Sequence, residues 1–256
     1  LNYNITTLNI NDCKLGILPN MPKKLIILKC RNNKLTELTW RHMPDSLKYL
    51  DCSQNFGITE LTELPPHLEF LNCSNTSVRK FNGERTFPLT LKVLKARNAS
   101  LGSCCIFSMA LEYIDVSKNK IRGRFSARFK KIKYLNISCN QIYDLPVHQN
   151  IEYLNCNHNF IWELYTVDDF GLYRRQFNKI KYLDCSYNKL FKINILSEQL
   201  EYLDCSHNEL NSLPLIPKTI KTIKCNNNMI ENFPLLEMPS SINYINISYN
   251  KIKKIP

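Results

Sequence analysis

Apolar residues recur along the chain in a short cycle, and the clearest copy runs from Leu200 to Pro214, LEYLDCSHNELNSLP. In this copy the first, fourth, sixth and eleventh positions are apolar, and the ninth is asparagine. Copies begin about every 20–22 residues, at Ile5, Leu25, Leu47, Leu68, Leu91, Leu111, Ile132, Ile151, Ile180, Leu200, Ile220 and Ile242. A fixed period over the whole chain predicts about twelve repeats that must stack, because no single repeat can bury its own apolar face.

The apolar alternation at positions four and six predicts a short strand with one face turned inward. Asparagine fills the ninth position in nine repeats: Asn33, Asn55, Asn119, Asn140, Asn159, Asn188, Asn208, Asn228 and Asn250. Its amide both donates and accepts hydrogen bonds, so we expect it to satisfy buried main-chain groups of the turn and of the neighbouring repeat. Cys13, Thr76 and Ala99 replace it elsewhere.

Proline follows the strand and turn and precedes the next repeat, as Pro214 and Pro217 do. Because proline lacks an N–H and restricts the residue before it, regular helix is excluded from this return path. We therefore predict an α/β-type solenoid that is strongly β-biased. It would be a horseshoe with a curved parallel sheet on the concave side and extended, polyproline-like or 3₁₀ segments on the convex side. Residues 1–256 are expected to form this single solenoid.

An insertion at residues 165–179 interrupts the eighth repeat. Val167, Phe170, Tyr173 and Phe177 are spaced like one face of a helix, which predicts a short helix projecting from the back or edge.

The pattern resembles that of leucine-rich repeat proteins over nearly the whole chain. The short segment LPLIPKTI, residues 213–220, is similar to the effector type of pathogenic bacteria. The abundance of Asn, Lys, Ile and Tyr also resembles leucine-rich repeat proteins of AT-rich genomes, including giant viruses of amoebae. The resemblance implies a protein-binding module acting in a host cell, effector-like or viral. It also leaves open the substrate-recognition part of a larger ubiquitin-ligase-like effector. The chain begins at Leu1, and we expect it to be a piece of a longer protein.

Seven of the eleven cysteines fall at the sixth, inward position: Cys30, Cys52, Cys73, Cys156, Cys185, Cys205 and Cys225. Other repeats place Ile, Val or Ala there, so the position requires a small apolar side chain, and free cysteine behaves as one. A column of neighbouring thiols would be at risk under oxidising conditions, so we expect a reducing compartment, cytoplasmic or inside a host cell. No run of residues is apolar enough to span a bilayer.

Positions three, five and seven should face the concave side, and position three is aromatic in eight repeats. Aromatic anchors flanked by polar groups are typical of interface hot spots. We predict partner-binding residues at Tyr113, Tyr134, Tyr153, Tyr182, Tyr202, Asp115, Asp184 and Asp204. The same tyrosines would also stiffen the sheet by stacking from one repeat to the next, and both interpretations stay open.

Position two alternates in sign from the third to the eleventh repeat: Lys48, Glu69, Lys92, Glu112, Lys133, Glu152, Lys181, Glu201 and Lys221. On adjacent strands each charge would have opposite neighbours, so this row should specify how the repeats stack. The alternation also indicates that the array grew by copying pairs of repeats.

Nucleic acid is the rival partner class, because the net charge is +12 and a basic field attracts polyanions. The basic residues concentrate in one stretch, 118–133: Lys118, Lys120, Arg122, Arg124, Arg128, Lys130, Lys131 and Lys133. Acidic residues also occur on the aromatic face, which favours a protein partner.

Residue patterns for catalysis, metal or cofactor binding are weak. Cys156 with His158, and Cys205 with His207, would place the thiol inside and the imidazole outside, so they should not converge. We predict no enzyme activity, no cofactor, no metal and no small-molecule substrate.

Overall fold

The computed structural model describes residues 4–39, 43–81, 87–103, 110–125, 129–148, 150–167, 173–174, 179–193, 196–233 and 238–253. The chain divides into an N-terminal unit, Leu1–Ile121 with Ser126–Ile132, and a C-terminal unit, Arg122–Phe125 with Lys133–Pro256. Each unit is a parallel β-solenoid in which every repeat contributes one short strand. The described residues form no helix, and so none that is long and apolar enough to cross a bilayer.

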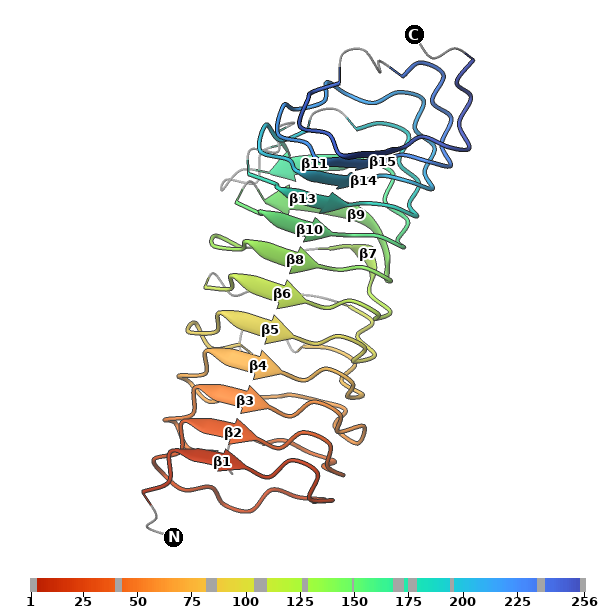
Figure 1. Ribbon diagram of the computed structural model, residues 1–256. Helices are drawn as coiled ribbons and strands as arrows, with labels where there is room; N and C mark the ends of the chain where they lie inside the picture. Colours follow the sequence, from red (N-terminus) through yellow and green to blue (C-terminus); the bar gives the residue numbers. More distant parts are fainter. Residues whose placement is uncertain are drawn as a thin grey trace. The chain divides into compact units, whose positions relative to one another are not determined.

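The strands of each unit pair in parallel, each with the strand of the next repeat (Figure 1). The N-terminal unit holds β1 (Thr7–Asn9), β2 (Ile27–Lys29), β3 (Tyr49–Asp51), β4 (Phe70–Asn72), β5 (Val93–Lys95) and β6 (Tyr113–Asp115). The C-terminal unit holds β8 (Tyr134–Asn136), β10 (Tyr153–Asn155), β13 (Tyr182–Asp184), β14 (Tyr202–Asp204), β15 (Thr222–Lys224) and β16 (Tyr244–Asn246). The register has no shift, so equivalent repeat positions lie side by side, as Leu154, Leu183 and Leu203 do.

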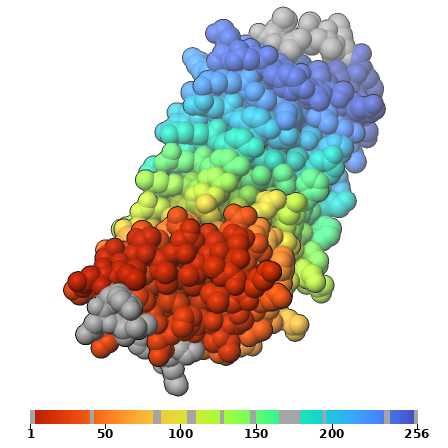
Figure 2. Space-filling model, turned by 60° about the horizontal axis from the view of Figure 1, so that its bottom comes forward, coloured from red at the N-terminus to blue at the C-terminus, as the bar shows by residue number. Residues whose placement is uncertain are grey.

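The core consists of the inward positions predicted from the sequence. Leu200, Leu203 and Cys205 are 0% exposed, while Tyr202 between them is half-buried on the outer side. The middle residue of every main-sheet strand from β2 to β15 is likewise buried, because the side-chain period of a strand is two. In the space-filling view, successive coils of the N-terminal unit, coloured from red to yellow, lie directly against one another (Figure 2). The prediction of a β-biased parallel solenoid is thus confirmed, and its continuity over residues 1–256 stays a prediction.

The asparagine of the ninth position joins neighbouring repeats. The amide nitrogen of Asn188 donates to the carbonyl of Cys185 in its own repeat at 3.1 Å and to that of Cys156 in the preceding repeat at 3.0 Å. Its amide oxygen accepts the main-chain N–H of Ile161 at 3.0 Å. Asn208, Asn228 and their equivalents repeat this pattern. Thr76, which replaces asparagine, keeps one of these bonds, to the carbonyl of Cys73 at 2.8 Å.

The turn after each strand uses a left-handed residue at the eighth position. Its φ lies between 51° and 59° in every repeat, at Asp12, Asn32, Gln54, Asn75, Asn98, Lys118, Cys139, His158, Tyr187, His207, Asn227 and Tyr249. Asparagine, aspartate and histidine tolerate this conformation best, while other non-glycine residues lose about 1–2 kcal/mol in it. In nine repeats the next residue is the asparagine of position nine, whose hydrogen bonds offset the strain of the turn.

A second sheet, which the sequence did not predict, forms from return segments of the C-terminal unit. It runs in the order β12 (Tyr173–Arg174), β11 (Leu164–Val167), β9 (Gln141–His148) and β7 (Arg122–Arg124). Figure 1 shows β9 and β11 behind the strands of the main sheet. The return path is extended, as predicted, and its main-chain groups pair with those of the next repeat.

The helix predicted within the insertion at 165–179 is wrong. Val167 ends β11 and pairs in antiparallel register with Tyr173 of β12, whereas Phe170 and Phe177 lie outside the described residues. Parallel pairing with β9 continues through Val167, opposite His148, so the strand retains hydrogen bonds that a helix would break. Gly171, which weakens a helix, falls between the two strands.

Candidate functional site

Four predicted site residues form one continuous stack on the outer side of the main sheet in the C-terminal unit. The ring centroids of Tyr134 and Tyr153 are 4.2 Å apart, those of Tyr153 and Tyr182 4.3 Å, and those of Tyr182 and Tyr202 4.4 Å. Their planes differ by no more than 8°. We call Tyr134, Tyr153, Tyr182 and Tyr202 the tyrosine ladder. Stacking covers the ring faces, and each of the four side chains is half-buried.

Tyr113, the fifth predicted tyrosine, lies on β6 of the N-terminal unit. The ammonium of Lys95 sits 5.5 Å from its ring centroid and 5.7 Å from that of Phe70. Phe70 in turn stacks on Tyr49 at 4.2 Å. Lysine therefore fills the gap in the aromatic row where position three is Val93, and cation–π contact replaces ring stacking.

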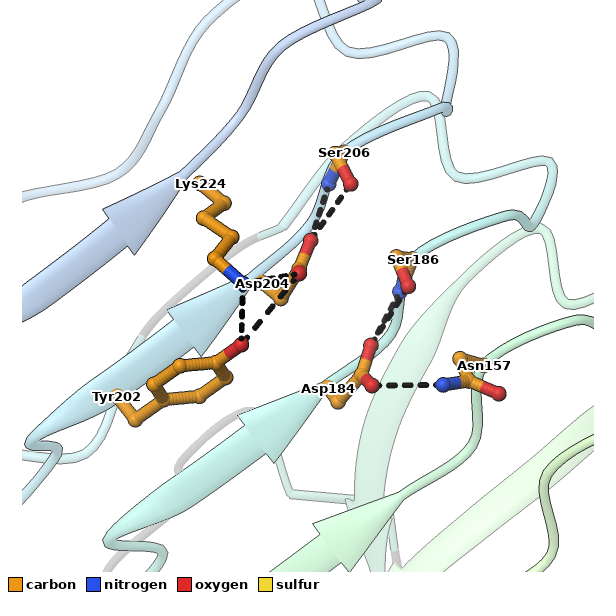
Figure 3. A network of polar contacts seen from close by, with 7 residues as sticks. All are labelled: Asn157, Asp184, Ser186, Tyr202, Asp204, Ser206 and Lys224. Carbon is orange, nitrogen blue, oxygen red and sulfur yellow. Dashed lines mark hydrogen bonds and ion pairs between the residues drawn. The ribbon is translucent and has the colours of Figure 1, made fainter. Parts of the chain in front are cut away.

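The predicted aspartates are engaged in local hydrogen bonds (Figure 3). One carboxylate oxygen of Asp204 accepts both the hydroxyl of Ser206 at 2.6 Å and its main-chain N–H at 3.1 Å. Asp184 and Ser186 repeat this arrangement at 2.7 and 3.1 Å, and so do Asp115 and Ser117 at 2.6 and 3.0 Å. The recurring Asp-x-Ser sequence is the signal that could have shown it.

The second carboxylate oxygens of Asp184 and Asp204 contact residues of a neighbouring repeat. That of Asp184 accepts the amide of Asn157 at 2.7 Å, and that of Asp204 lies 3.6 Å from the ammonium of Lys224. Lys224 also donates to the hydroxyl of Tyr202 at 3.1 Å. Asp184 and Asp204 are only 8% and 9% exposed. Their contribution to partner binding stays a prediction, and their structural role is to fix the turn behind the ladder.

Burial, together with neighbouring Tyr153, Tyr202 and Asp184, raises the pKa of the Tyr182 phenol well above its usual value. Burial, and to a lesser extent Asp51, likewise raises the pKa of Tyr49. Such phenols stay protonated at physiological pH. They therefore offer hydrogen-bond donors as well as acceptors along the edge of the ladder.

The alternating charges at position two pair as predicted in each unit. Glu69 contacts Lys48 at 3.3 Å and Lys92 at 2.7 Å. In the C-terminal unit, Glu152 contacts Lys181 at 3.0 Å and Glu201 contacts Lys221 at 2.6 Å. Hydrogen bonds from these lysines hold the pKa of each of the three glutamates below its ordinary value. These four ion pairs join neighbouring repeats within the row.

The predicted basic patch divides between the two units. Lys118, Lys120, Lys130 and Lys131 are exposed in the N-terminal unit, and Arg122 and Arg124 are exposed on β7 of the C-terminal unit. Arg124 contacts Asp144 at 3.5 Å. Arg128 lies outside the described residues. That the basic patch binds a polyanion stays a prediction.

Sequence reasoning missed a group of aromatic residues at positions eight, ten and twelve, around the asparagine turn of the C-terminal unit. Tyr143, Phe160, Trp162, Tyr187 and Phe191 are between 45% and 53% exposed. The eighth repeat carries the signal, because His158, Phe160 and Trp162 alternate with the inward Asn159 and Ile161. We call Tyr143, Phe160, Trp162, Tyr187 and Phe191 the aromatic flank.

The thiols of the sixth position are free and buried, as predicted. Burial raises the pKa of Cys30, Cys73 and Cys225 to about 12, and that of Cys185 and Cys205 also rises well above the ordinary value. Cys156 is buried while His158 is exposed, so this pair does not converge. Among the described residues no three His, Cys, Asp or Glu side chains are arranged to hold a metal ion. Cys104 and Cys105 lie outside them.

Comparisons with known proteins agree with this geometry. The Leucine Rich Repeat family model matches residues 199–222. The functional domain of InlJ from Listeria monocytogenes, which includes a cysteine ladder, is 25% identical with a TM-score of 0.73 over 99% of this chain. The leucine-rich repeat protein LIC12759 of Leptospira interrogans is 21% identical with a TM-score of 0.63, over 90% of this chain and 68% of that one.

The leucine-rich effector protein YopM from Yersinia pestis is 23% identical with a TM-score of 0.53, over 98% of this chain and 85% of its own. No curated protein sequence matches. The chain spans 56% of the InlJ structure. Its repeats, its parallel solenoid and its matches are those of a leucine-rich repeat protein.

Proposed function

We propose that this protein is a non-enzymatic interaction module that binds a protein partner through the tyrosine ladder. The stack of four parallel rings is the observation that carries the proposal. Neighbouring rings already hold each side chain, so little conformational entropy remains to be lost when a partner binds. Tyrosine is enriched among interface hot spots because it combines a large apolar body with a polar tip.

The setting we propose is a reducing one, the cytoplasm or the interior of a host cell, where the chain would act as an effector-like or viral protein. The free thiols of the sixth position support a reducing compartment. The fold shared with YopM, a leucine-rich effector protein, is compatible with this setting. Recognition of a substrate for a larger ubiquitin-ligase-like effector remains the narrower form of the same proposal.

The test compares Tyr153→Ala/Tyr182→Ala with Tyr244→Ala. Tyr244 occupies the same repeat position on β16, but Thr222 separates it from the ladder. Partners captured from candidate host-cell lysate are identified by mass spectrometry, and their affinity is then measured with purified components. We expect the double variant to weaken binding by at least about tenfold, and Tyr244→Ala to leave it unchanged. Equal binding by all three proteins would exclude the ladder as the contact surface.

A second candidate function is polyanion binding, which the net charge of +12 favours. It predicts a steep loss of DNA or RNA binding between low and physiological salt. Replacing Lys118, Lys120, Lys130 and Lys131 by glutamine would remove that binding, whereas Tyr153→Ala/Tyr182→Ala would leave it intact.

A further inference from the structure

The aromatic flank lies on three successive repeats of the C-terminal unit, at positions eight, ten and twelve around the asparagine turn. Phe160 and Trp162 occupy positions ten and twelve of their repeat, and Tyr143 and Phe191 occupy position twelve of the repeats on either side. The rings of Trp162 and Phe191 are nearly parallel, with 7° between their planes and 6.4 Å between their centroids. Intervening Ile142, Ile161 and Leu190 are 0% exposed.

Packing within the fold does not require aromatic residues at these places. The equivalent positions of the tenth repeat hold Glu209 and Asn211, and that repeat closes its core equally well around Leu210. Tyr187 stacks between His158 and His207, with ring centroids 4.2 and 4.0 Å apart, so its edge and hydroxyl are what it offers to a partner. Tyr143, Phe160, Trp162 and Phe191, about half exposed on adjacent repeats, make an apolar surface of the kind that marks an interaction site.

The main chain beneath the aromatic flank is already paired. The N–H of Phe160 donates to the carbonyl of Ile142 at 2.8 Å, and that of Lys189 to the carbonyl of Ile161 at 2.9 Å. The N–H of Ile161 is held by the amide oxygen of Asn188. A partner therefore cannot add as a β-strand at this place, and recognition must come from side chains.

Side-chain recognition by aromatic rings with a few donors fits a polyproline II segment. Such a segment has no internal hydrogen bonds, so its carbonyls are free to accept from the indole N–H of Trp162 and from the hydroxyls of Tyr143 and Tyr187. Its proline rings are apolar and rigid, and aromatic-lined surfaces bind them without a large loss of entropy.

The charges around the aromatic flank favour an acidic partner. Arg122 and Lys192 are exposed, and the side chains of Arg124 and Lys189 are 50% and 62% exposed. The nearby acids are more covered: the Asp144 side chain is 22% exposed and Glu163 is half-buried. Glu209, 49% exposed, is 3.7 Å from Lys189. Positive charge is therefore the more accessible at this surface.

We propose that the aromatic flank binds an extended, proline-rich protein segment that carries acidic residues. This surface is separate from the tyrosine ladder, which lies on the strands of the main sheet. The prolines pack against Phe160, Trp162 and Phe191, and the acidic residues lie toward Arg122, Lys189 and Lys192.

The test uses short synthetic peptides of repeating Pro-Pro-Glu, Pro-Pro-Lys and Gly-Ser-Glu, and a single-stranded oligonucleotide of similar length. The sequence contains two tryptophans, so Trp40→Phe makes Trp162 the reporter for fluorescence titration, and calorimetry gives the affinity. We expect saturable binding of Pro-Pro-Glu and at least about tenfold weaker binding of the other probes. Tighter binding of the oligonucleotide, equal binding of Gly-Ser-Glu, or no binding of Pro-Pro-Glu would each overturn the proposal.

Variants then locate the site. Phe160→Ala/Phe191→Ala should weaken Pro-Pro-Glu binding by at least about tenfold, and the single Phe191→Ala provides a milder change if the double variant is unstable. Tyr249→Ala is the matched control, because Tyr249 is 80% exposed and lies outside the aromatic flank. Tyr153→Ala/Tyr182→Ala should leave peptide binding unchanged. Unaltered binding by both flank variants, or an equal loss in Tyr249→Ala, would contradict the assignment.

Discussion

Replacing Asn188 by alanine should destabilise the C-terminal unit more than any exposed substitution. Asn188 is 5% exposed, and its amide serves the N–H of Ile161 and the carbonyls of Cys156 and Cys185. Alanine cannot replace any of these bonds. The carbonyl of Cys156 keeps a hydrogen bond from Asn159 at 3.1 Å, and that of Cys185 keeps one from Asn208 at 3.0 Å, so only the N–H of Ile161 loses its partner. A buried polar group without a partner costs about 1–3 kcal/mol, so we expect a stability loss in that range.

Two further variants refine that prediction. Asn188→Asp keeps an acceptor for Ile161 but places a carboxylate against two carbonyls, so at neutral pH it should be at least as harmful as alanine. Asn188→Thr should lie between alanine and wild type, because Thr76 naturally keeps one equivalent bond.

The measurement combines urea unfolding, followed by circular dichroism, with amide hydrogen exchange. Exchange should accelerate at Ile161 and change less at Leu190, whose N–H bonds to Asn208 at 2.9 Å. A stability loss below about 0.5 kcal/mol, the range of ordinary surface substitutions, together with unchanged exchange at Ile161 would refute the role of the asparagine column.

Two other predictions follow from the described contacts. Glu152→Lys replaces the ion pair with Lys181 by repulsion, and it should lower the free energy of unfolding by up to about 1 kcal/mol at low salt and by less at high salt. The control is Glu198→Lys, which makes the same charge change outside the row. An unchanged or raised melting temperature of Glu152→Lys at low salt would contradict the prediction. Among the described cysteines, the exposed Cys13 and the half-exposed Cys139 should react with iodoacetamide in the native state, while the buried thiols should react only after unfolding. Mass spectrometry measures the labelling. Rapid labelling of Cys185 or Cys205 in the native protein would contradict the buried position of these thiols.

Much of the fold could be predicted because the same pattern of apolar and polar positions recurs in each repeat. Leu203 and Cys205 alternate with Tyr202 and Asp204, and a period of two is sufficient to assign inside and outside on a strand. Asparagine at a fixed distance after the strand identified the turn, because few side chains both donate and accept inside a core. The second sheet was harder to predict from the sequence, because the pairing of return segments depends on how repeats of unequal length align.

The insertion shows where local periodicity misleads. Val167, Phe170, Tyr173 and Phe177 have helical spacing, yet Val167 and Tyr173 pair as strands, because β9 offers a partner to the segment that ends at Val167. The candidate surfaces show a related limit. Outward positions were predictable, but the hydrogen bonds from Ser186 and Ser206 that cover Asp184 and Asp204 depend on the turn geometry.

The alternating charges of position two impose a parity on how many repeats can be removed or inserted. Excising residues 180–199 would bring Glu152 beside Glu201, whereas excising residues 180–219 would bring Glu152 beside Lys221 and restore attraction. Removing or inserting two repeats therefore keeps the alternation, whereas removing or inserting one repeat places two like charges side by side at the junction. Internal deletions and insertions built for engineering should accordingly remove or add an even number of repeats.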